Sequence, residues 1–311
     1  MSLRCVCLTS ALALTAGQAA AEMNFNRIAS FPVVKNMAEG ADTTRETSPE
    51  IIAATADGMT LVYTDSPLGM IGMVDITDPA NPAPLGAMDV GGEPTSVGIV
   101  GTTAFVGVNT SESYTVPSGK LISVDIAGKV ETGACDLGGQ PDSVAIAPDG
   151  NFVSVAIENE RDEDLNDGVL PQLPAGTLAL VPLKDGALDC AGMKMASLTG
   201  LADVAPTDPE PEFVDINSLG ETVVTLQENN HIAVVDKDGK VISHFSAGSV
   251  DLDGIDATDE RGALVFTESQ PGRLREPDAV KWVDENHFAP PTKATTRAVR
   301  VAGRSSTRTA P

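Results

Sequence analysis

The sequence predicts an all-β protein, a β-propeller of four-stranded antiparallel blades. A unit recurs in which a proline leads an alternating apolar run, a turn and a second run of the same kind. A further pair of strand-like runs follows in the earlier copies, so each unit holds two hairpins. The first two spacings between the leading prolines are 45 and 47 residues, which match one propeller blade. A β-sandwich is the alternative fold, but it does not explain a repeat of two hairpins.

The first hairpin of the unit is clearest after Pro141, where residues 144–147 and 152–155 flank a Pro-Asp-Gly turn. Alternating β-branched and apolar runs separated by Asp-Gly, or by a close equivalent, are typical of hairpins. The second element is a strand that ends in Val-Asp before a turn, as in residues 122–126, with Val-Pro in the third unit. Copies of the first element begin at Pro49, Pro94, Pro141, Pro211 and Pro277.

The third and fourth spacings are longer, at 70 and 66 residues. Residues 158–174 form an acidic, proline-bearing stretch, and residues 203–211 are rich in proline and aspartate. Such clusters between periodic segments predict loops, which we expect on one face of the disc. Five units are too few for a ring of the seven-bladed type, so we expect an incomplete ring with unpaired sheet edges.

The composition restricts the possible partners. The chain has 44 acidic and 20 basic residues, a net charge of −24, with a hydrophobic fraction of 42%. This hydrophobic fraction is sufficient for a core and argues against general disorder. The acidic balance argues against nucleic acid and anionic membrane as partners, because phosphate binding needs clustered Lys and Arg. Cations, basic surfaces and neutral ligands stay open, and the protein or small-molecule partner is unknown.

Residues 1–21 have the pattern of a secretory signal peptide. Arg4 provides the positive charge, residues 5–16 form a short apolar run, and residues 19–21 are three alanines. The run is too short to span a bilayer, which takes about 20 residues. The alternative is a buried N-terminal helix. No later segment reaches spanning length, so we expect a periplasmic or extracellular protein without a membrane span.

Cysteine usage follows from that cleavage. Cys5 and Cys7 leave with the signal, so Cys135 and Cys190 are the pair in the mature chain. In an oxidising compartment these two cysteines predict one disulfide. Closing a loop of this length stabilises a fold by about 4–5 kcal/mol in the chain-entropy model. Two separate buried thiols are the alternative.

The C-terminal segment 290–311 differs in composition from residues 22–289, which hold the predicted blades. It carries basic residues, no acidic residue and no strand pattern. With the codon frame shifted by one base, the segment after Ala289 can encode an acidic, strand-like string with an Asp-Lys-Asp-Gly turn like that of residues 236–239. We therefore expect a disordered, out-of-frame tail of a truncated protein. A genuine disordered basic tail is the alternative.

Five segments follow one another in an order that is characteristic of one family. They are residues 74–82 (Val-Asp-Ile-Thr-Asp-Pro-Ala-Asn-Pro), 209–214, 225–236 (Thr-Leu-Gln-Glu-Asn-Asn-His-Ile-Ala-Val-Val-Asp), 253–263 and 276–280. In these segments the chain resembles the choice-of-anchor I family of bacterial secreted β-propeller proteins, which is related to mesenchyme-specific cell-surface glycoprotein repeats. The likeness covers about residues 25–289 and breaks at Pro290.

The resemblance implies an exported propeller of the seven-bladed type. Some relatives are labelled alkaline phosphatase or phytase-like esterase. The family offers no catalytic motif that transfers residue by residue to this chain, so the catalytic residues stay unknown and enzymatic activity is uncertain, with a non-catalytic role favoured.

The chain lacks the common catalytic motifs. Neither Gly-x-Ser-x-Gly nor His-Glu-x-x-His occurs, and the predicted mature chain has no Cys-x-x-Cys. The Gly-Gly pairs at 91–92 and 138–139 precede predicted strands rather than helices, which indicates turns and not phosphate-binding loops. The histidines, His231, His244 and His287, are interpreted as packed or exposed residues and not as catalysts.

Acidic residues beside the leading prolines are the strongest candidate for a site. In a propeller, the start of each innermost strand lies at the mouth of the central channel, so a repeated position becomes a ring of oxygen ligands. Ca²⁺ takes six to eight oxygens, and clustered carboxylates repel one another until a cation binds. The alternative is that these are solvated turn residues. The candidate ligands are Glu50, Glu93, Asp142, Glu210, Glu212, Glu276 and Asp278.

Two classes of function are consistent with this pattern. The favoured one is an exported, non-catalytic binding or scaffold propeller that holds Ca²⁺ at the channel mouth. The alternative is a metal-dependent phosphoesterase, in which the same carboxylates hold the cation against a phosphate. The fold alone does not decide between them.

Overall fold

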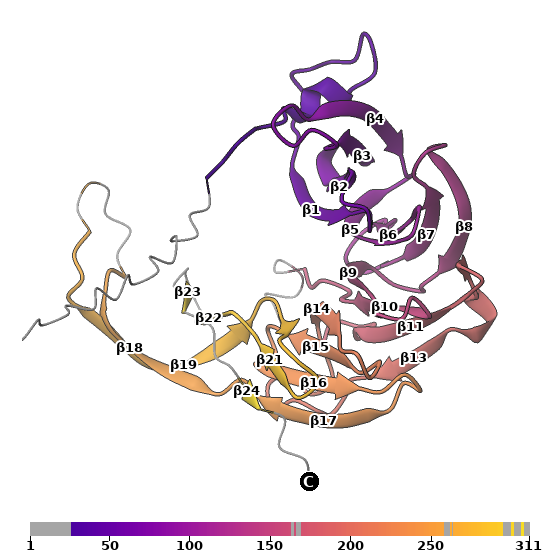
Figure 1. The fold of residues 1–311 in the computed structure, drawn as a ribbon. Helices are drawn as coiled ribbons and strands as arrows, with labels where there is room; N and C mark the ends of the chain where they lie inside the picture. Colours follow the sequence, from indigo (N-terminus) through magenta and orange to yellow (C-terminus); the bar gives the residue numbers. More distant parts are fainter. Residues whose placement is uncertain are drawn as a thin grey trace, which may run out of the picture.

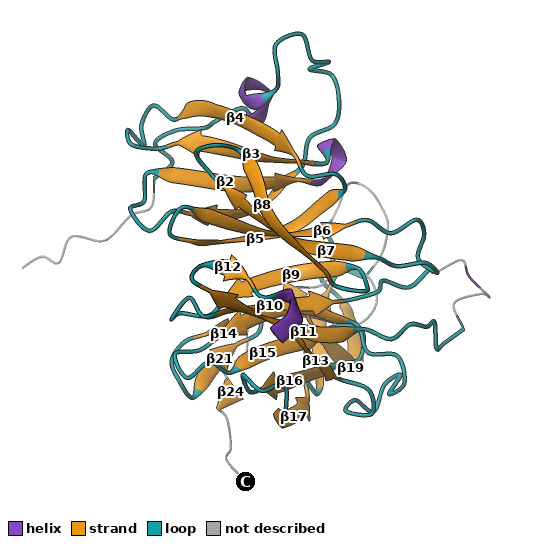
Figure 2. Cartoon of the chain, turned by 90° about the vertical axis from the view of Figure 1, so that its right-hand side faces the viewer, coloured by secondary structure: helices purple, strands orange, loops and turns teal. Residues whose placement is uncertain are grey.

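The computed structural model shows an open arc of β-sheet blades that follow one another in chain order (Figure 1). The structure describes residues 26–162, 165, 169–257, 262, 264–294, 300–301 and 306–307. Successive blades fan around a common centre, and from the side their sheets stack along the arc (Figure 2). The predicted all-β propeller of four-stranded antiparallel blades is confirmed.

The first, second and fourth blades are antiparallel sheets in which four strands pair in chain order. In the third blade, the strands β12 and β13 both pair with β11. The strands of these blades are β1 (Pro49–Ala54), β2 (Thr60–Asp65), β3 (Met70–Asp75), β4 (Ala83–Asp89), β5 (Glu93–Val100), β6 (Thr103–Asn109), β7 (Gly119–Asp125), β8 (Val130–Asp136), β9 (Pro141–Ile146), β10 (Phe152–Ile157), β11 (Thr177–Lys184), β12 (Ala187–Leu188), β13 (Lys194–Ser197), β14 (Pro211–Ile216), β15 (Thr222–Leu226), β16 (His231–Val235) and β17 (Val241–Ser246).

Apolar clusters between neighbouring blades form the core. Strand residues alternate between the two sheet faces, so both faces of an inner blade carry apolar side chains. Between the first two blades, Val62 and Ile71 belong to the same cluster as Val97 and Val106. Corresponding clusters lie between the next pairs of blades. Each blade is therefore stabilised mainly by its neighbours in the arc.

Short 3₁₀ helices are the helical elements of the described residues: η1 (Val33–Asn36), η2 (Ser66–Leu68) and η4 (Cys190–Gly192). The first carries Asn36, whose amide donates to Tyr63 Oη at 3.1 Å and to the Met73 carbonyl at 2.9 Å. The N-terminal segment is thereby attached to the first blade. Among all the residues that the structure describes, no helix has the length and apolar composition of a membrane span.

The long fourth spacing between leading prolines, from Pro211 to Pro277, has a cause that the sequence interpretation missed. Both predicted loops, 158–174 and 203–211, belong to the third unit, between β10 and β11 and between β13 and β14. The fourth unit is lengthened instead by a hairpin of β18 (Ser249–Ile255) and β19 (Glu268–Pro277), which leaves the arc (Figure 1). Each of its strands has one buried residue, Leu252 on β18 and Pro277 on β19, so they do not show the buried apolar runs that mark the blades.

The fifth unit is small. It consists of β20 (Lys281–Trp282) and β21 (His287–Ala289), which pair with each other. Within 290–311, the described residues include three short strands: β22 (Thr292–Ala294) pairs with β19, β23 (Arg300–Val301) with β22, and β24 (Ser306–Thr307) with β21. The disordered, out-of-frame tail stays a prediction. The predicted signal 1–21 and the other tail residues lie outside the described residues.

Asp215 on β14 joins the fourth and fifth units. Its carboxylate accepts from the Trp282 backbone N–H at 2.7 Å and from Lys281 Nζ at 2.6 Å. The Trp282 indole N–H donates to the Asp215 carbonyl at 3.2 Å. The ring of Trp282 packs edge-on against Phe288, with centroids 5.0 Å apart. One buried carboxylate thus fixes the position of β20.

A disulfide between Cys135 and Cys190 joins two blades, with the two Cα atoms 5.3 Å apart. Cys135 is buried in β8 of the second blade, and Cys190 begins η4 beside β11 of the third. The bond closes a sequence separation of 55 residues. It links the outer parts of two blades whose inner strands already pack together.

Replacing both cysteines by serine should destabilise the protein by about 2–5 kcal/mol, because the unfolded chain regains the entropy of the open loop. Urea unfolding of the purified variant and of the parent measures the difference. A reductant should lower the midpoint of the parent and leave the double variant unchanged. Equal midpoints for the oxidised parent and the variant would show that the bond adds no stability.

Asp215→Ala should release β20, because the backbone N–H of the buried Trp282 loses its carboxylate acceptor. Leaving that N–H without a partner costs about 1–3 kcal/mol. Trp282 is the one tryptophan of the chain, so its fluorescence reports directly on this junction. We expect red-shifted emission and an earlier unfolding transition. Asp215→Asn, which keeps one acceptor oxygen, should lie between Ala and the parent. Unchanged emission in Asp215→Ala would contradict this role.

Candidate functional site

The carboxylates beside the leading prolines meet in one cavity of about 430 Å³. The residue directly after the proline lines it in all five units, and it is acidic in four of them. Five of the seven predicted ligands are among the lining residues. The lining consists of Glu50, Glu93, Asp142, Glu212 and Asp278 from the predicted set, together with Ile51, Ser66, Thr95, Ser96, Gln140, Ser143, Glu158, Glu160 and Phe213.

A β-bulge next to the proline places these side chains. The pairing register shifts directly after Pro49, Pro94 and Pro211, and at the matching position opposite Pro141. Proline cannot donate to the strand ladder, so it is tolerated at the first residue of a strand and at bulges. A bulge re-aims the side chain that it contains. The repeated proline therefore explains why the residue that follows it points to the shared cavity.

In three blades, the backbone N–H of the residue before the proline donates to a side-chain oxygen at or just after the end of the second strand. The Ser48 N–H donates to Asp65 Oδ1 at 3.0 Å, and the Glu210 N–H donates to Asn229 Oδ1 at 2.8 Å. In the third blade, the Gln140 N–H donates to Asn159 at 2.9 Å. The same contact thus recurs in the first, third and fourth blades. In these three blades it fixes the backbone directly before the inner strand.

The loop 158–174 supplies two acidic residues that the sequence interpretation did not include among the ligands. Glu158 and Glu160 directly follow β10 and line the cavity. The acidic composition of the stretch was visible in the sequence. The signal that would have identified them is their position, because residues just after the second strand lie at the same end of the blade as the start of the first.

Glu210 and Glu276, the other two predicted ligands, do not line the cavity. Glu210 belongs to a cluster around Arg161, whose side chain is 10% exposed. The guanidinium lies 2.7 Å from Glu210, 3.1 Å from Asp208 and 2.6 Å from Glu228. One cation thus serves three carboxylates and ties the loop of the third blade to the fourth. Sequence reasoning missed Arg161, because nothing near it in sequence marks its partners.

A second cation pairs with one acid of the cavity lining. Lys293 Nζ is 2.8 Å from Asp278 Oδ1. Among the described residues, no Lys or Arg lies within ion-pair distance of Glu50, Asp142, Glu158 or Glu212. The cavity therefore holds more acidic side chains than the surrounding basic residues can neutralise.

Burial and mutual repulsion raise the pKa values of these acids. Burial, followed by the charges of Glu50, Glu160 and Asp278, raises the pKa of Asp142 to about 7. Burial, followed by Asp142 and Asp278, raises the pKa of Glu212 to about 9. The pKa of Glu158 is raised to about 8 by burial and by Asp142. Glu212 Oε2 is also buried without a hydrogen-bond partner.

The pKa values of the two predicted ligands outside the lining are raised as well. For Glu210 the causes are burial and then Glu228, with Arg161 acting against them. For Glu276 the causes are burial and then Glu228. Removing charged carboxylates from water is costly unless a cation compensates them. The arrangement is suited to binding positive charge.

The fit to a metal ion is looser than a preformed cage. Within the described residues, no three His, Cys, Asp or Glu side chains already surround one point at metal-binding distances. Ca²⁺ uses flexible geometry and accepts water among its six to eight oxygen ligands. Carboxylates lining a cavity of about 430 Å³ fit a cation that keeps part of its water shell.

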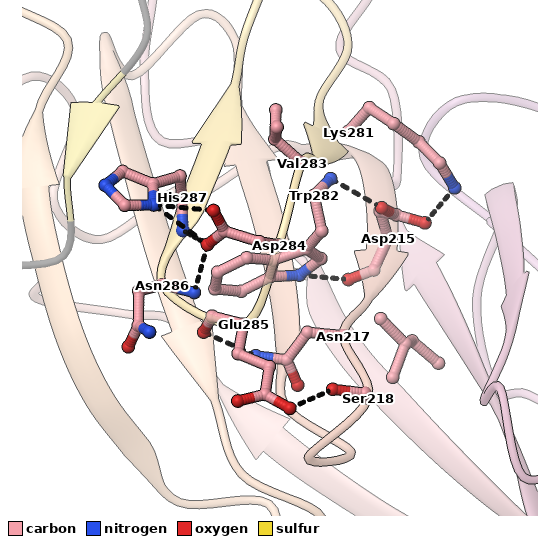
Figure 3. A pocket seen from close by; sticks show the side chains of 11 residues that line it. Asp215, Asn217, Ser218, Lys281, Trp282, Val283, Asp284, Glu285, Asn286 and His287 are labelled. Carbon is pink, nitrogen blue, oxygen red and sulfur yellow. Dashed lines mark hydrogen bonds and ion pairs between the residues drawn. The ribbon is translucent and has the colours of Figure 1, made fainter.

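A second cavity, of about 540 Å³, lies between the fourth and fifth units (Figure 3). None of the predicted ligands lines it. The Asp284 carboxylate accepts from the backbone of His287 and lies 2.8 Å from its ring, and Glu285 accepts from Ser218 at 2.9 Å. The Asp284 contacts lie within the β20–β21 turn, and the Ser218–Glu285 bond holds that turn against the fourth blade.

Comparison with known proteins gives a family and a fold. The profile of the choice-of-anchor I domain matches residues 50–288. Among curated proteins, none matches the chain. A chain of the mitotic checkpoint complex has a TM-score of 0.51 and 9% identity, over 85% of this chain and 66% of that chain. At this identity the likeness shows the fold alone.

Two other solved structures are similar at lower TM-scores. Hydrazine synthase of Kuenenia stuttgartiensis has 17% identity over 82% of this chain and 84% of that chain, with a TM-score of 0.42. A functionally unknown protein from Desulfotomaculum acetoxidans has 11% identity over 86% and 72%, with a TM-score of 0.48. Because the family profile spans all five units of the arc, the chain belongs to the choice-of-anchor I domain family.

Proposed function

We propose that this protein is an exported, non-catalytic binding or scaffold propeller that holds a hard divalent cation, Ca²⁺, at its channel mouth. The observation that carries the proposal is the convergence of the residue after each leading proline on one cavity. Four of these five residues are acidic, and the loop 158–174 adds two more carboxylates. Burial and, after it, repulsion from neighbouring carboxylates raise the pKa values of Asp142 and Glu212, and a bound cation would offset both effects.

Membership of the choice-of-anchor I family suggests a secreted or surface protein. The signal-like pattern of residues 1–21 and the disulfide between Cys135 and Cys190 support export to the periplasm or the cell exterior, because disulfides persist in oxidising compartments. Extracellular Ca²⁺ sites work at concentrations of about 10⁻⁴–10⁻³ M. A loosely arranged carboxylate site is consistent with that range.

Calcium should stabilise the protein, because a ligand that binds only the folded state shifts the unfolding equilibrium. At a hundredfold excess over Kd the gain is about 2.7 kcal/mol, or about 5–10 °C in Tm. Calorimetric titration and thermal melts of the chelator-treated protein measure both effects. Asp142→Asn combined with Glu212→Gln should abolish the shift.

The matched control is Glu131→Gln on β8, which removes a carboxylate that does not line the cavity and should leave the calcium shift intact. Loss of the shift in this control, or its survival in the double variant, would refute the proposed site. The same samples are assayed with p-nitrophenyl phosphate. Calcium-dependent turnover that disappears in the double variant would replace the binding role by a metal-dependent phosphoesterase.

In the absence of calcium, stability should fall as pH rises. Carboxyl groups with a raised folded-state pKa hold protons that the unfolded chain has already released, so their contribution is complete below about pH 4 and lost through their folded-state values. For Asp142, Glu158 and Glu212 these values are about 7, 8 and 9. In chelator, Tm should therefore decrease from pH 5 to pH 9.

Calcium should flatten this decrease, because it stabilises the ionised carboxylates, and so should Asp142→Asn with Glu212→Gln. Circular dichroism melts in matched buffers measure the slope. A Tm that is constant or rises over this pH range in chelator would show that burial and mutual repulsion do not raise the pKa values of these acids in the folded state.

A further inference from the structure

A histidine pair on the fourth blade lies outside both cavities described above. His231 begins β16 and His244 lies on the neighbouring strand β17. In their antiparallel register His231 is opposite Ser246 and Ala233 is opposite His244. The two imidazoles are therefore diagonal neighbours on one face of the sheet, a spacing that long and aromatic side chains bridge.

The ring nitrogens of the pair face each other. His231 Nε2 and His244 Nδ1 are 3.0 Å apart, with the ring planes tilted by 37°. His231 is 4% exposed, and its other nitrogen, Nδ1, is buried without a hydrogen-bond partner. When both rings are neutral, one proton lies between His231 Nε2 and His244 Nδ1. In either tautomer of His231, its other nitrogen, Nδ1, then has no hydrogen-bond partner.

The spacing matches two ligands of one metal ion. Imidazole binds zinc at about 2.0–2.1 Å, so two such nitrogens at angles of 90–109° around the ion lie about 2.9–3.4 Å apart. His244 is exposed, which opens the pair to solvent. Asp203, in the loop before β14, is close enough for its negative charge to act on His231, and it would also favour a cation.

We propose that His231 and His244 form a two-imidazole site for a borderline divalent transition metal, such as Cu²⁺, Zn²⁺ or Ni²⁺, on the outer part of the fourth blade. Imidazole suits these metals, whereas the carboxylates of the channel mouth suit Ca²⁺. On metal binding, the proton shared between His231 Nε2 and His244 Nδ1 would move to the other nitrogen of the ring that carries it, so that both facing nitrogens could donate a lone pair to the metal, and water would complete the coordination. Within the described residues no third side chain already surrounds this point.

The test is a Cu²⁺ titration of the full chain, with excess Mg²⁺ present to occupy the acidic cavity. Electron paramagnetic resonance should show one Cu²⁺ per chain with coupling to two nitrogens. His244→Ala should remove the second nitrogen and weaken binding by about tenfold or more. Because His231 is buried, His231→Asn is included only with a melt that shows it is folded, and it should give the same loss.

His287→Ala is the matched control, since His287 is the third histidine of the chain and lines the other cavity. It should leave the affinity and the two-nitrogen signal unchanged. A wild-type signal without two nitrogens, a His244→Ala variant that binds as tightly as wild type, or a loss in His287→Ala would overturn the assignment. None of these results depends on whether the channel mouth binds Ca²⁺.

Discussion

Repulsion among the carboxylates that line the shared cavity opposes formation of the arc, so the contacts between blades have to compensate for it. The repeat places an acidic side chain after the leading proline in four of five units, and the arc brings those side chains into one cavity. Each added blade therefore adds charge to the same small volume. Apolar packing between blades must outweigh this repulsion for the arc to form.

Polar contacts between inner strands work in the same direction as the apolar clusters. The Val144 N–H donates to Ser96 Oγ of the preceding blade at 3.0 Å, and the Val214 N–H donates to Ser143 Oγ at 3.3 Å. These contacts occur beside the bulges, where the strand ladder is interrupted and a backbone N–H is free to reach the neighbouring blade. The bulge thus aims an acid at the cavity and also provides a bond that holds the blades together.

Arg161 shows how the chain itself compensates part of the excess charge. A guanidinium binds several carboxylates through its planar set of donors, and here it joins the loop of the third blade to the fourth. Asp142 and Glu212, which line the cavity, are left without such a partner among the described residues. In the proposed function, this difference makes the cavity, and not the Arg161 cluster, the place where an external cation would gain most.

Local patterns in the sequence determined the blades, because alternation and turn chemistry act over a few residues: the hairpin after Pro141 forms as β9 and β10. The repeat also identified the acids beside the prolines as one set. Which of them share a cavity was decided by the tertiary structure, since Glu210 pairs with Arg161 through a loop that no repeat rule places. The local sequence pattern also predicted neither the β18–β19 hairpin nor the contact between His231 and His244. Cross-strand and cross-blade neighbours depend on register and curvature, which a linear pattern does not contain.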